Sequence, residues 1–189
     1  MKLEFYYPWW GSEAMPHGEF AGRVADAGYA GVEAFLPEDI DAEAFRTALD
    51  KRGLAYIAQH ALTLDPNFDS HLITQERQLR RLAALEPLFL SSQTGRDLFS
   101  YEQNKELLAV ADTVAADSGV QIIHETHRGR FSFAAHLTRR YLEDLPNLRL
   151  TLDISHWCNV AESLLEDQEE AVALAIARTD HVHARVGFA

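Results

Sequence analysis

The sequence contains one cysteine, few basic residues and no long apolar run, and each shortage narrows what the protein can be. Cys158 cannot form a disulfide within the chain, which suits a reducing compartment, so we expect a cytoplasmic protein in which this thiol packs. With 17 Lys and Arg against 29 Asp and Glu, the net charge is -12, which disfavours nucleic acid as a partner. No stretch approaches the about 18 apolar residues that span a bilayer, so we expect no membrane segment.

The chain also lacks the G-x-G-x-x-G loop that a doubly wound nucleotide-binding sheet carries after its first strand. Instead, seven short apolar runs alternate with six segments of helical periodicity, in units of about 25–33 residues, as expected of repeated βα units with a parallel sheet. The predicted strands are Leu3–Tyr7, Ala30–Phe35, Leu54–Gln59, Pro87–Leu90, Val120–His124, Leu148–Asp153 and His181–Arg185.

Helix boundaries are indicated by capping residues. Ser100 and Gln103 have the spacing of a capping box, and Gly119 supplies a left-handed stop for the helix that they open. Ser132 is predicted to open the next helix, and the acidic stretch Glu162–Glu170 to begin the last one. The pattern therefore predicts an α/β protein.

Polar or aromatic residues follow most of the predicted strands, and this arrangement favours a (β/α)8 TIM barrel. Scattered strand ends become neighbours only when the strands form a ring, where they build a site at its C-terminal face. Among these residues we predict substrate-binding roles for Trp9, His60, Gln93 and Arg185.

Three strand ends carry metal-ligand chemistry. Side chains alternate along a strand, so Glu125, Asp153 and His183 all lie on the polar faces that must point into the barrel. Two carboxylates and an imidazole suit Mn²⁺, Mg²⁺, Co²⁺ or Zn²⁺. Any one of them alone is more simply a satisfied polar residue, but three at matching strand ends favour one shared metal site.

Other polar residues near these strand ends could serve the site or only stabilise the fold. His156 lies three residues past Asp153, where it contacts substrate or a second metal, or hydrogen-bonds the backbone. Arg185 on the inward face, or Arg128 and Arg130 in the loop after strand five, could hold an anion such as phosphate or carboxylate, and for the two loop arginines a salt bridge is the alternative. His124 faces away from Glu125, so we assign it to packing.

The length of the chain predicts an open barrel. A TIM barrel typically needs about 250 residues, and this chain ends just after its seventh predicted strand. We therefore expect a single domain over residues 1–189 that lacks the eighth βα unit. Its two edge strands would be unpaired, so we expect either a form truncated from a longer protein or a homodimer that covers the edges.

The E-x-H, D-x-x-H and H-x-H-x-R stretches at the ends of strands five, six and seven resemble the xylose-isomerase-like TIM barrels. That superfamily includes sugar phosphate isomerases and epimerases, ketose 3-epimerases, hydroxypyruvate isomerases and AP endonucleases. The resemblance implies that Glu125, Asp153 and His183 hold a divalent metal, which a glutamate from strand eight completes in the isomerase and epimerase branches. It also implies that Glu125 acts as a catalytic acid/base and that His156 contacts substrate.

The resemblance thus implies a metal-dependent sugar or sugar phosphate isomerase or epimerase, acting through an enediolate and impaired where the eighth strand is missing. One alternative is a zinc-dependent phosphodiesterase like the AP endonucleases. The net charge opposes it, as does Gln93 at a strand end where another histidine is expected. A second alternative is a non-catalytic barrel in which aromatic residues line a sugar pocket. Those aromatic residues are Trp9, Trp10, Phe131 and Phe133.

Overall fold

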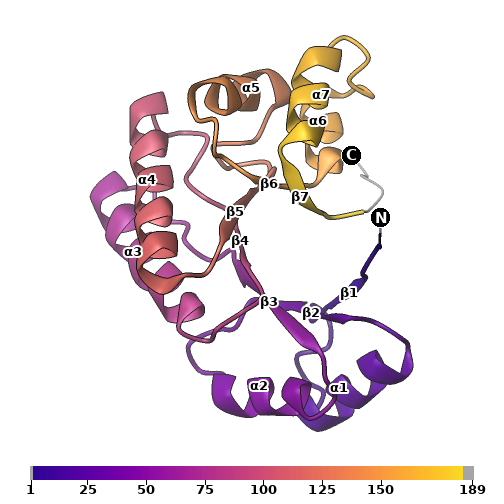
Figure 1. The fold of residues 1–189 in the computed structure, drawn as a ribbon. Helices are drawn as coiled ribbons and strands as arrows, with labels where there is room; N and C mark the ends of the chain where they lie inside the picture. The colour runs from indigo at the N-terminus through magenta and orange to yellow at the C-terminus, as the bar shows by residue number, and fades with distance from the viewer. Residues whose placement is uncertain (1, 185–189) are drawn as a thin grey trace.

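A computed structural model describes residues 2–184, in which seven strands form one parallel sheet in the order β1 to β7. The sheet curls into an open ring with the helices on its outside (Figure 1). The strands are β1 (Tyr6–Pro8), β2 (Gly31–Ala34), β3 (Ala55–His60), β4 (Leu90–Ser92), β5 (Ile122–Glu125), β6 (Leu150–Leu152) and β7 (Thr179–Val182). The helices are α1 (His17–Asp26), α2 (Ala42–Asp50), α3 (Phe68–Ala83), α4 (Tyr101–Ser118), α5 (Ala135–Asp144), α6 (Ile154–Ala161) and α7 (Glu169–Ala177).

The ring is that of a (β/α) TIM barrel with seven of its strands, as the sequence predicts. Each strand pairs with the next one along the chain, whereas β1 and β7 each have a second edge that no strand pairs within residues 2–184. In Figure 1 these two strands flank the opening of the ring. Among the described residues, no helix is both long and apolar enough to cross a membrane.

The register carries one polar face around the inside of the ring. Gln59 pairs with Ser91 and Ser91 with Ile123, so these three side chains share a face, and Glu125 joins it two residues further along β5. Ser91 on β4 also meets Thr151 on β6, with 2.8 Å between their hydroxyl oxygens. Because β4 and β6 are not neighbours in the sheet, this hydrogen bond must cross the interior.

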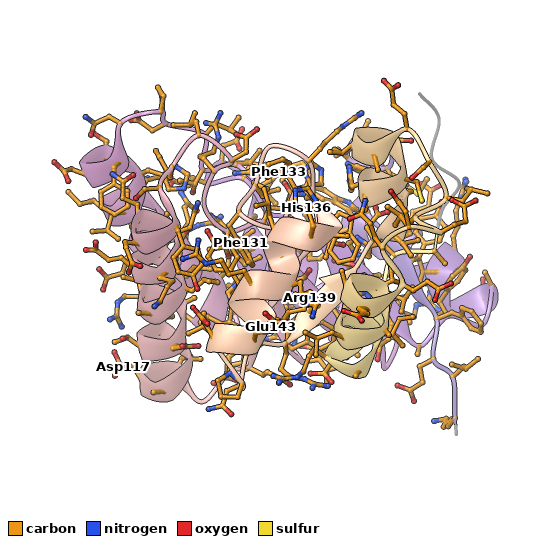
Figure 2. All side chains as sticks on the ribbon, turned by 90° about the horizontal axis from the view of Figure 1, so that it is seen from above. Asp117, Phe131, Phe133, His136, Arg139 and Glu143 are labelled. Atoms are coloured by element: carbon orange, nitrogen blue, oxygen red, sulfur yellow. The ribbon has the colours of Figure 1, made fainter. Side chains whose placement is uncertain are left out.

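The outer surface of the helices carries solvated ion pairs. Arg139 on α5 contacts Glu143 and Glu170, each with a nitrogen-to-oxygen distance of 2.6 Å. Figure 2 labels Arg139 and Glu143 on this helix, together with Asp117 on α4. Exposed pairs of this kind contribute little to stability, because water screens the charges and ordering the side chains costs entropy.

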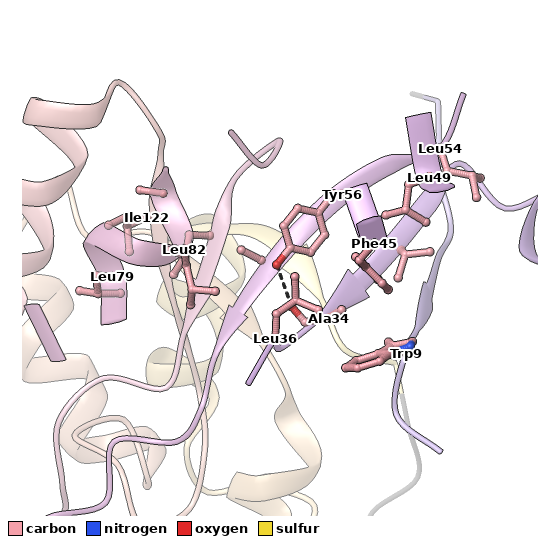
Figure 3. Packing of buried hydrophobic residues seen from close by; sticks show 14 of the residues in the cluster. Trp9, Ala34, Leu36, Phe45, Leu49, Leu54, Tyr56, Leu79, Leu82 and Ile122 are labelled. Atoms are coloured by element: carbon pink, nitrogen blue, oxygen red, sulfur yellow. Dashed lines mark hydrogen bonds between the residues drawn. The ribbon is translucent and has the colours of Figure 1, made fainter. Parts of the chain in front are cut away.

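The hydrophobic core lies between the strands and the helices. Val32 and Ala34 of β2 point into it, alongside Phe45 of α2 and Tyr56 of β3. Figure 3 shows the Tyr56 hydroxyl donating to the carbonyl oxygen of Ala34, at 3.3 Å. A second cluster, which includes Trp157, occupies the same layer around β6. The apolar layer therefore follows the outer face of the strands, whereas their inner face combines polar groups with the buried side chains of Ile57 and Ile123.

Several predicted boundaries are confirmed. Ser100 and Gln103 form a capping box at the start of α4, and Gly119 ends that helix in the left-handed conformation with φ 73°.

The helix start predicted at Ser132 is wrong, because α5 begins only at Ala135. The Ser132 hydroxyl instead donates to the carbonyl oxygen of Glu125 at 2.6 Å, so it fastens the loop after β5.

The described residues contain seven helices where the sequence predicted six. The additional helix, α6, starts directly after β6 and is capped by Asp153, whose carboxylate accepts from the Ser155 amide at 3.1 Å. The acidic stretch does not begin the last helix at Glu162, which ends α6 with φ 50°; α7 begins at Glu169. The seventh strand also starts earlier than predicted, and Arg185 lies outside the described residues.

Candidate functional site

Three strands deliver the predicted ligand residues to one place. Glu125 ends β5, Asp153 follows β6 and His183 follows β7, and one ligand atom from each lies within 4.8 Å of the other two. Glu125 and Asp153 are only 2% and 1% exposed. Buried carboxylates need a compensating positive charge. Two such groups and an imidazole at this spacing form a donor set that a divalent cation can bind.

A fourth residue of the site, Glu33, was missed by the sequence reasoning. Its carboxylate oxygens lie 3.0 and 2.9 Å from Nε2 of His183, and the second of them is 3.1 Å from Nε2 of His181. A signal was present in the sequence, because Glu33 is the only charged residue of β2. It alternates with Val32 and Ala34, which both face the core. A lone carboxylate on the inner face of a strand belongs to the interior site.

The charges of the site are strongly coupled. Burial alone would lower the pKa of His183, but hydrogen bonds to Glu125 and Glu33 outweigh it and raise the pKa to about 10. Burial would raise the pKa of Glu33, but hydrogen bonds from His181 and His183 lower it to about 2. The pKa of Glu125 is lowered by the same balance. The imidazolium of His183 thus lies between two carboxylates and supplies the positive charge they require.

Gln93 and Arg130 support Glu125 from the side of β4. The Gln93 amide donates from Nε2 to Oε2 of Glu125 at 2.9 Å, and its Oε1 accepts from Arg130 at 3.3 Å. Arg130 also donates to the carbonyl oxygens of Ala61 and Thr63, at 2.7 and 2.8 Å. Neither role predicted for Arg130, anion binding or a salt bridge, fits these contacts. Its guanidinium is buried and ties together the loops that follow β3 and β5.

His156 borders the site from the first turn of α6. It is 2% exposed, its Nε2 lies 3.6 Å from Oδ2 of Asp153, and its ring centroid is 3.9 Å from that of His127. Ligand atoms of Glu125, His127 and His156 lie within 4.8 Å of one another. The substrate contact implied for His156 remains a prediction, and its position next to two ligand carboxylates is compatible with it.

Two residues predicted to bind substrate face the helices instead of the interior. Trp9 is 1% exposed and packs against Phe45 with a ring centroid distance of 5.3 Å, as Figure 3 illustrates. His60 is buried, with Nδ1 2.9 Å from the Ser92 hydroxyl and Nε2 2.7 Å from that of Thr63. The reason is strand alternation, since a shift of one residue reverses the face of a side chain. Substrate binding by either residue stays a prediction.

Comparisons with known proteins identify the family of this chain. A family model described as xylose isomerase-like TIM barrel matches residues 21–185. The chain belongs to this xylose isomerase-like TIM barrel family. The family resemblance expected from the three strand-end motifs is thus confirmed. A comparison with curated proteins found no match.

Solved structures of similar fold include an epimerase, a magnesium complex and an endonuclease. D-allulose 3-epimerase from Methylomonas sp., solved with D-allulose, is 22% identical with a TM-score of 0.71, over 96% of this chain and 72% of that one. A xylose isomerase-like TIM barrel protein from Mycobacterium smegmatis, solved with magnesium, is 14% identical with a TM-score of 0.64, over 91% and 68%. AP endonuclease, family 2 from Brucella melitensis is 17% identical with a TM-score of 0.63, over 96% and 78%. These likenesses establish the fold.

Proposed function

We propose that this xylose isomerase-like protein is a divalent-metal-dependent isomerase or epimerase of an open-chain sugar or sugar phosphate. The observation that carries the proposal is the set of two buried carboxylates, Glu125 and Asp153, and the half-buried imidazole of His183 inside the ring. The fold shared with an epimerase that binds D-allulose supports the same class of substrate. Reactions of this class move a proton on a carbon next to a carbonyl.

Glu125, Asp153 and His183 would hold the metal ion. When bound there, a divalent cation would polarise the carbonyl and the neighbouring hydroxyl of the substrate and so acidify the α-proton. Glu125 is the candidate base. Its pKa is lowered, which keeps the carboxylate ionised at neutral pH, and the hydrogen bond from Gln93 holds it in one orientation.

The proton transfer begins at Glu125, and neighbouring residues would orient the base and the substrate. Removal of the α-proton by Glu125 would give an enediolate. Return of that proton to the neighbouring carbon, with the hydroxyl proton passing to the former carbonyl oxygen, would give an isomer, whereas an epimer requires a proton from a second acid on the other face. His156 is the candidate group for a substrate hydroxyl, because it is buried beside Asp153. Gln93 and His156 thereby fix the orientation of the base and of the substrate.

Deuterium exchange tests this mechanism directly. The protein is incubated in D2O with aldoses, ketoses and their phosphates, with Mn²⁺, Mg²⁺, Co²⁺ or Zn²⁺ in turn, and the sugars are analysed by mass spectrometry. We expect one α-deuterium to enter a substrate, and Glu125→Gln to slow this exchange at least ~100-fold. The matched control is Glu106→Gln, an exposed carboxylate on α4. Exchange at an equal rate in the Glu125→Gln variant would contradict the proposal.

A second candidate function is zinc-dependent cleavage of a phosphodiester. Ligand atoms of His127 and His156 approach Glu125 and could extend the site to a further metal ion. Cleavage of abasic DNA in the presence of zinc would favour this reading, against which the net charge of -12 stands. A non-catalytic sugar pocket stays an alternative; of its predicted aromatic residues, Trp9 and Phe131 are buried in the apolar layer, whereas Trp10 is exposed.

A further inference from the structure

The side chain of Glu33 links two strands that do not pair with each other. Glu33 lies on β2, and its partners His181 and His183 lie on and just after β7. The two strands are separated in the sheet order, so the contacts cross the interior of the ring. The side chain is only 10% exposed and its two oxygens are occupied by imidazole nitrogens. It is therefore committed to these two histidines.

The two nitrogens of His183 face two different carboxylates. Nδ1 lies 3.1 Å from Oε1 of Glu125, on the side of the ligand set, and Nε2 lies 2.9 Å from Oε2 of Glu33. As an imidazolium, His183 carries a proton on both nitrogens. A cation that binds one nitrogen would replace its proton, because a metal ion needs a lone pair and a neutral imidazole has one N–H and one lone pair. A hydrogen bond from Nε2 to Glu33 therefore directs the lone pair of Nδ1 toward Glu125 and Asp153.

We propose that Glu33 is a positioning residue that sets the orientation and the tautomer of His183. This inference rests on the proposed metal-dependent function. Carboxylates that accept from the outer nitrogen of a ligand histidine recur in metal sites, where they make the ligand more basic and fix its ring. His181 holds Glu33 from a second direction, with its Nε2 3.1 Å from Oε2. The ring of His183 therefore has a defined place although β7 has an unpaired edge within residues 2–184.

Calorimetric titration with Mn²⁺ tests the inference. Glu33→Ala is expected to weaken Mn²⁺ binding about 10–100-fold, the range typical of lost outer partners of metal ligands. Glu33→Gln keeps an oxygen that accepts from Nε2, so it should restore most of the affinity. The matched control is Glu38→Ala, an exposed carboxylate after β2 that pairs with Arg77, and it should bind like the wild type. Far-UV circular dichroism and the thermal midpoint verify that each variant is folded.

Nitrogen NMR of the imidazoles adds a signature that a merely structural role would not change. With Zn²⁺ bound, His183 in the wild type should carry its proton on Nε2 and the metal on Nδ1, whereas Glu33→Ala should show a changed or mixed tautomer. If the wild type binds Mn²⁺ and Glu33→Ala binds it equally well, the positioning role is overturned and the proposed function stands. If the wild type binds no divalent metal, the proposed function falls, and this inference falls with it.

Discussion

The two faces of the same strands treat buried histidines in opposite ways. On the helix-facing side, His60 contacts the hydroxyls of Ser92 and Thr63, and His124 contacts that of Thr94. Burial lowers the pKa of His60 to about 3 and that of His124 to about 4. Both rings are therefore neutral at physiological pH and act as uncharged packing groups.

On the interior side, His183 lies between Glu33 and Glu125, and its pKa is raised to about 10. His60 and His124 are each 2% exposed and the His183 side chain is 20% exposed, and burial lowers the pKa of all three, so burial alone does not decide their charge. The partners decide it, because hydroxyls offer no charge to offset desolvation, whereas two carboxylates outweigh it. The inner face of this ring therefore holds charged groups, whereas the outer face keeps its histidines neutral.

The largest expected effect is a difference in substrate exchange rate between variants of two neighbouring residues on β5, Glu125 and His124. Glu125→Ala should reduce the rate of substrate deuterium exchange at least ~100-fold, because the inward carboxylate is the proposed base. His124→Asn should leave the rate per folded molecule close to that of the wild type, because that side chain faces Thr94 in the outer layer. Mass spectrometry of the exchanged sugar measures both. Equal losses in the two variants would break the distinction between the faces.

Next in size is the expected cost of removing Arg130. Arg130→Ala should lower the free energy of unfolding by about 3 kcal/mol, because the carbonyls of Ala61 and Thr63 lose a buried donor. It should also weaken metal binding, since the Gln93 amide is no longer held against Glu125. Urea unfolding and metal titration measure these effects. Arg130→Lys, which can donate to fewer of these oxygens, should fall between the alanine variant and the wild type.

The pH dependence of stability tests the neutral state of His60. Its folded pKa is about 3, below the ordinary value of 6.5, so the unfolded chain takes up the proton first as the pH falls. Stability from this group is fully present above pH ~6.5 and is lost toward pH 3, by up to about 1.4 kcal/mol per pH unit. The free energy of unfolding, measured with urea at several pH values between 7 and 4.5, should fall less steeply with decreasing pH in His60→Gln than in the wild type. An unchanged slope would mean that His60 is not held neutral.

The smallest expected effect lies outside both faces. Ser100→Ala removes the side chain that accepts from the Gln103 amide at the start of α4, and it should cost about 1 kcal/mol. The rate of substrate exchange and the affinity for Mn²⁺ should stay at wild-type values. Thermal unfolding measures the loss of stability, and calorimetric titration measures the affinity for Mn²⁺. A change in the Mn²⁺ affinity of Ser100→Ala would show that the interior site responds to destabilisation far from it, and that the difference between the two strand faces is not local.

The site was predictable where strand alternation was applied and unpredictable where it was not. Glu125, Asp153 and His183 were chosen by alternation, and the structure brings all three together. The prediction for Trp9 and His60 depends only on their place after or at the end of a strand; Trp9 packs in the core cluster, and His60 contacts Ser92 and Thr63. The step between consecutive residues reverses the face, so the position of a residue near a strand end does not by itself tell which face it occupies.

Other parts of the fold depend on contacts that are distant in the sequence. The seven parallel strands and the capping box of α4 follow from local periodicity and capping chemistry. The short helix α6 escaped prediction because it follows β6 without a loop and its cap, Asp153, was read only as a ligand. Strand alternation could have placed Glu33 on the inner face, but its contact with His183, 150 residues away along the chain, has no local signal.

The sequence by itself determined the alternation of strands and helices, the inward carboxylates and imidazole at strands five to seven, and hence the family. These features depend on period and spacing, which are local. Only the tertiary structure decided that Glu33 reaches His183 across the ring, that Arg130 holds Gln93 against Glu125, and which histidines are charged. Those properties depend on which groups meet in a water-poor interior, because there the partner and not the residue type sets the charge.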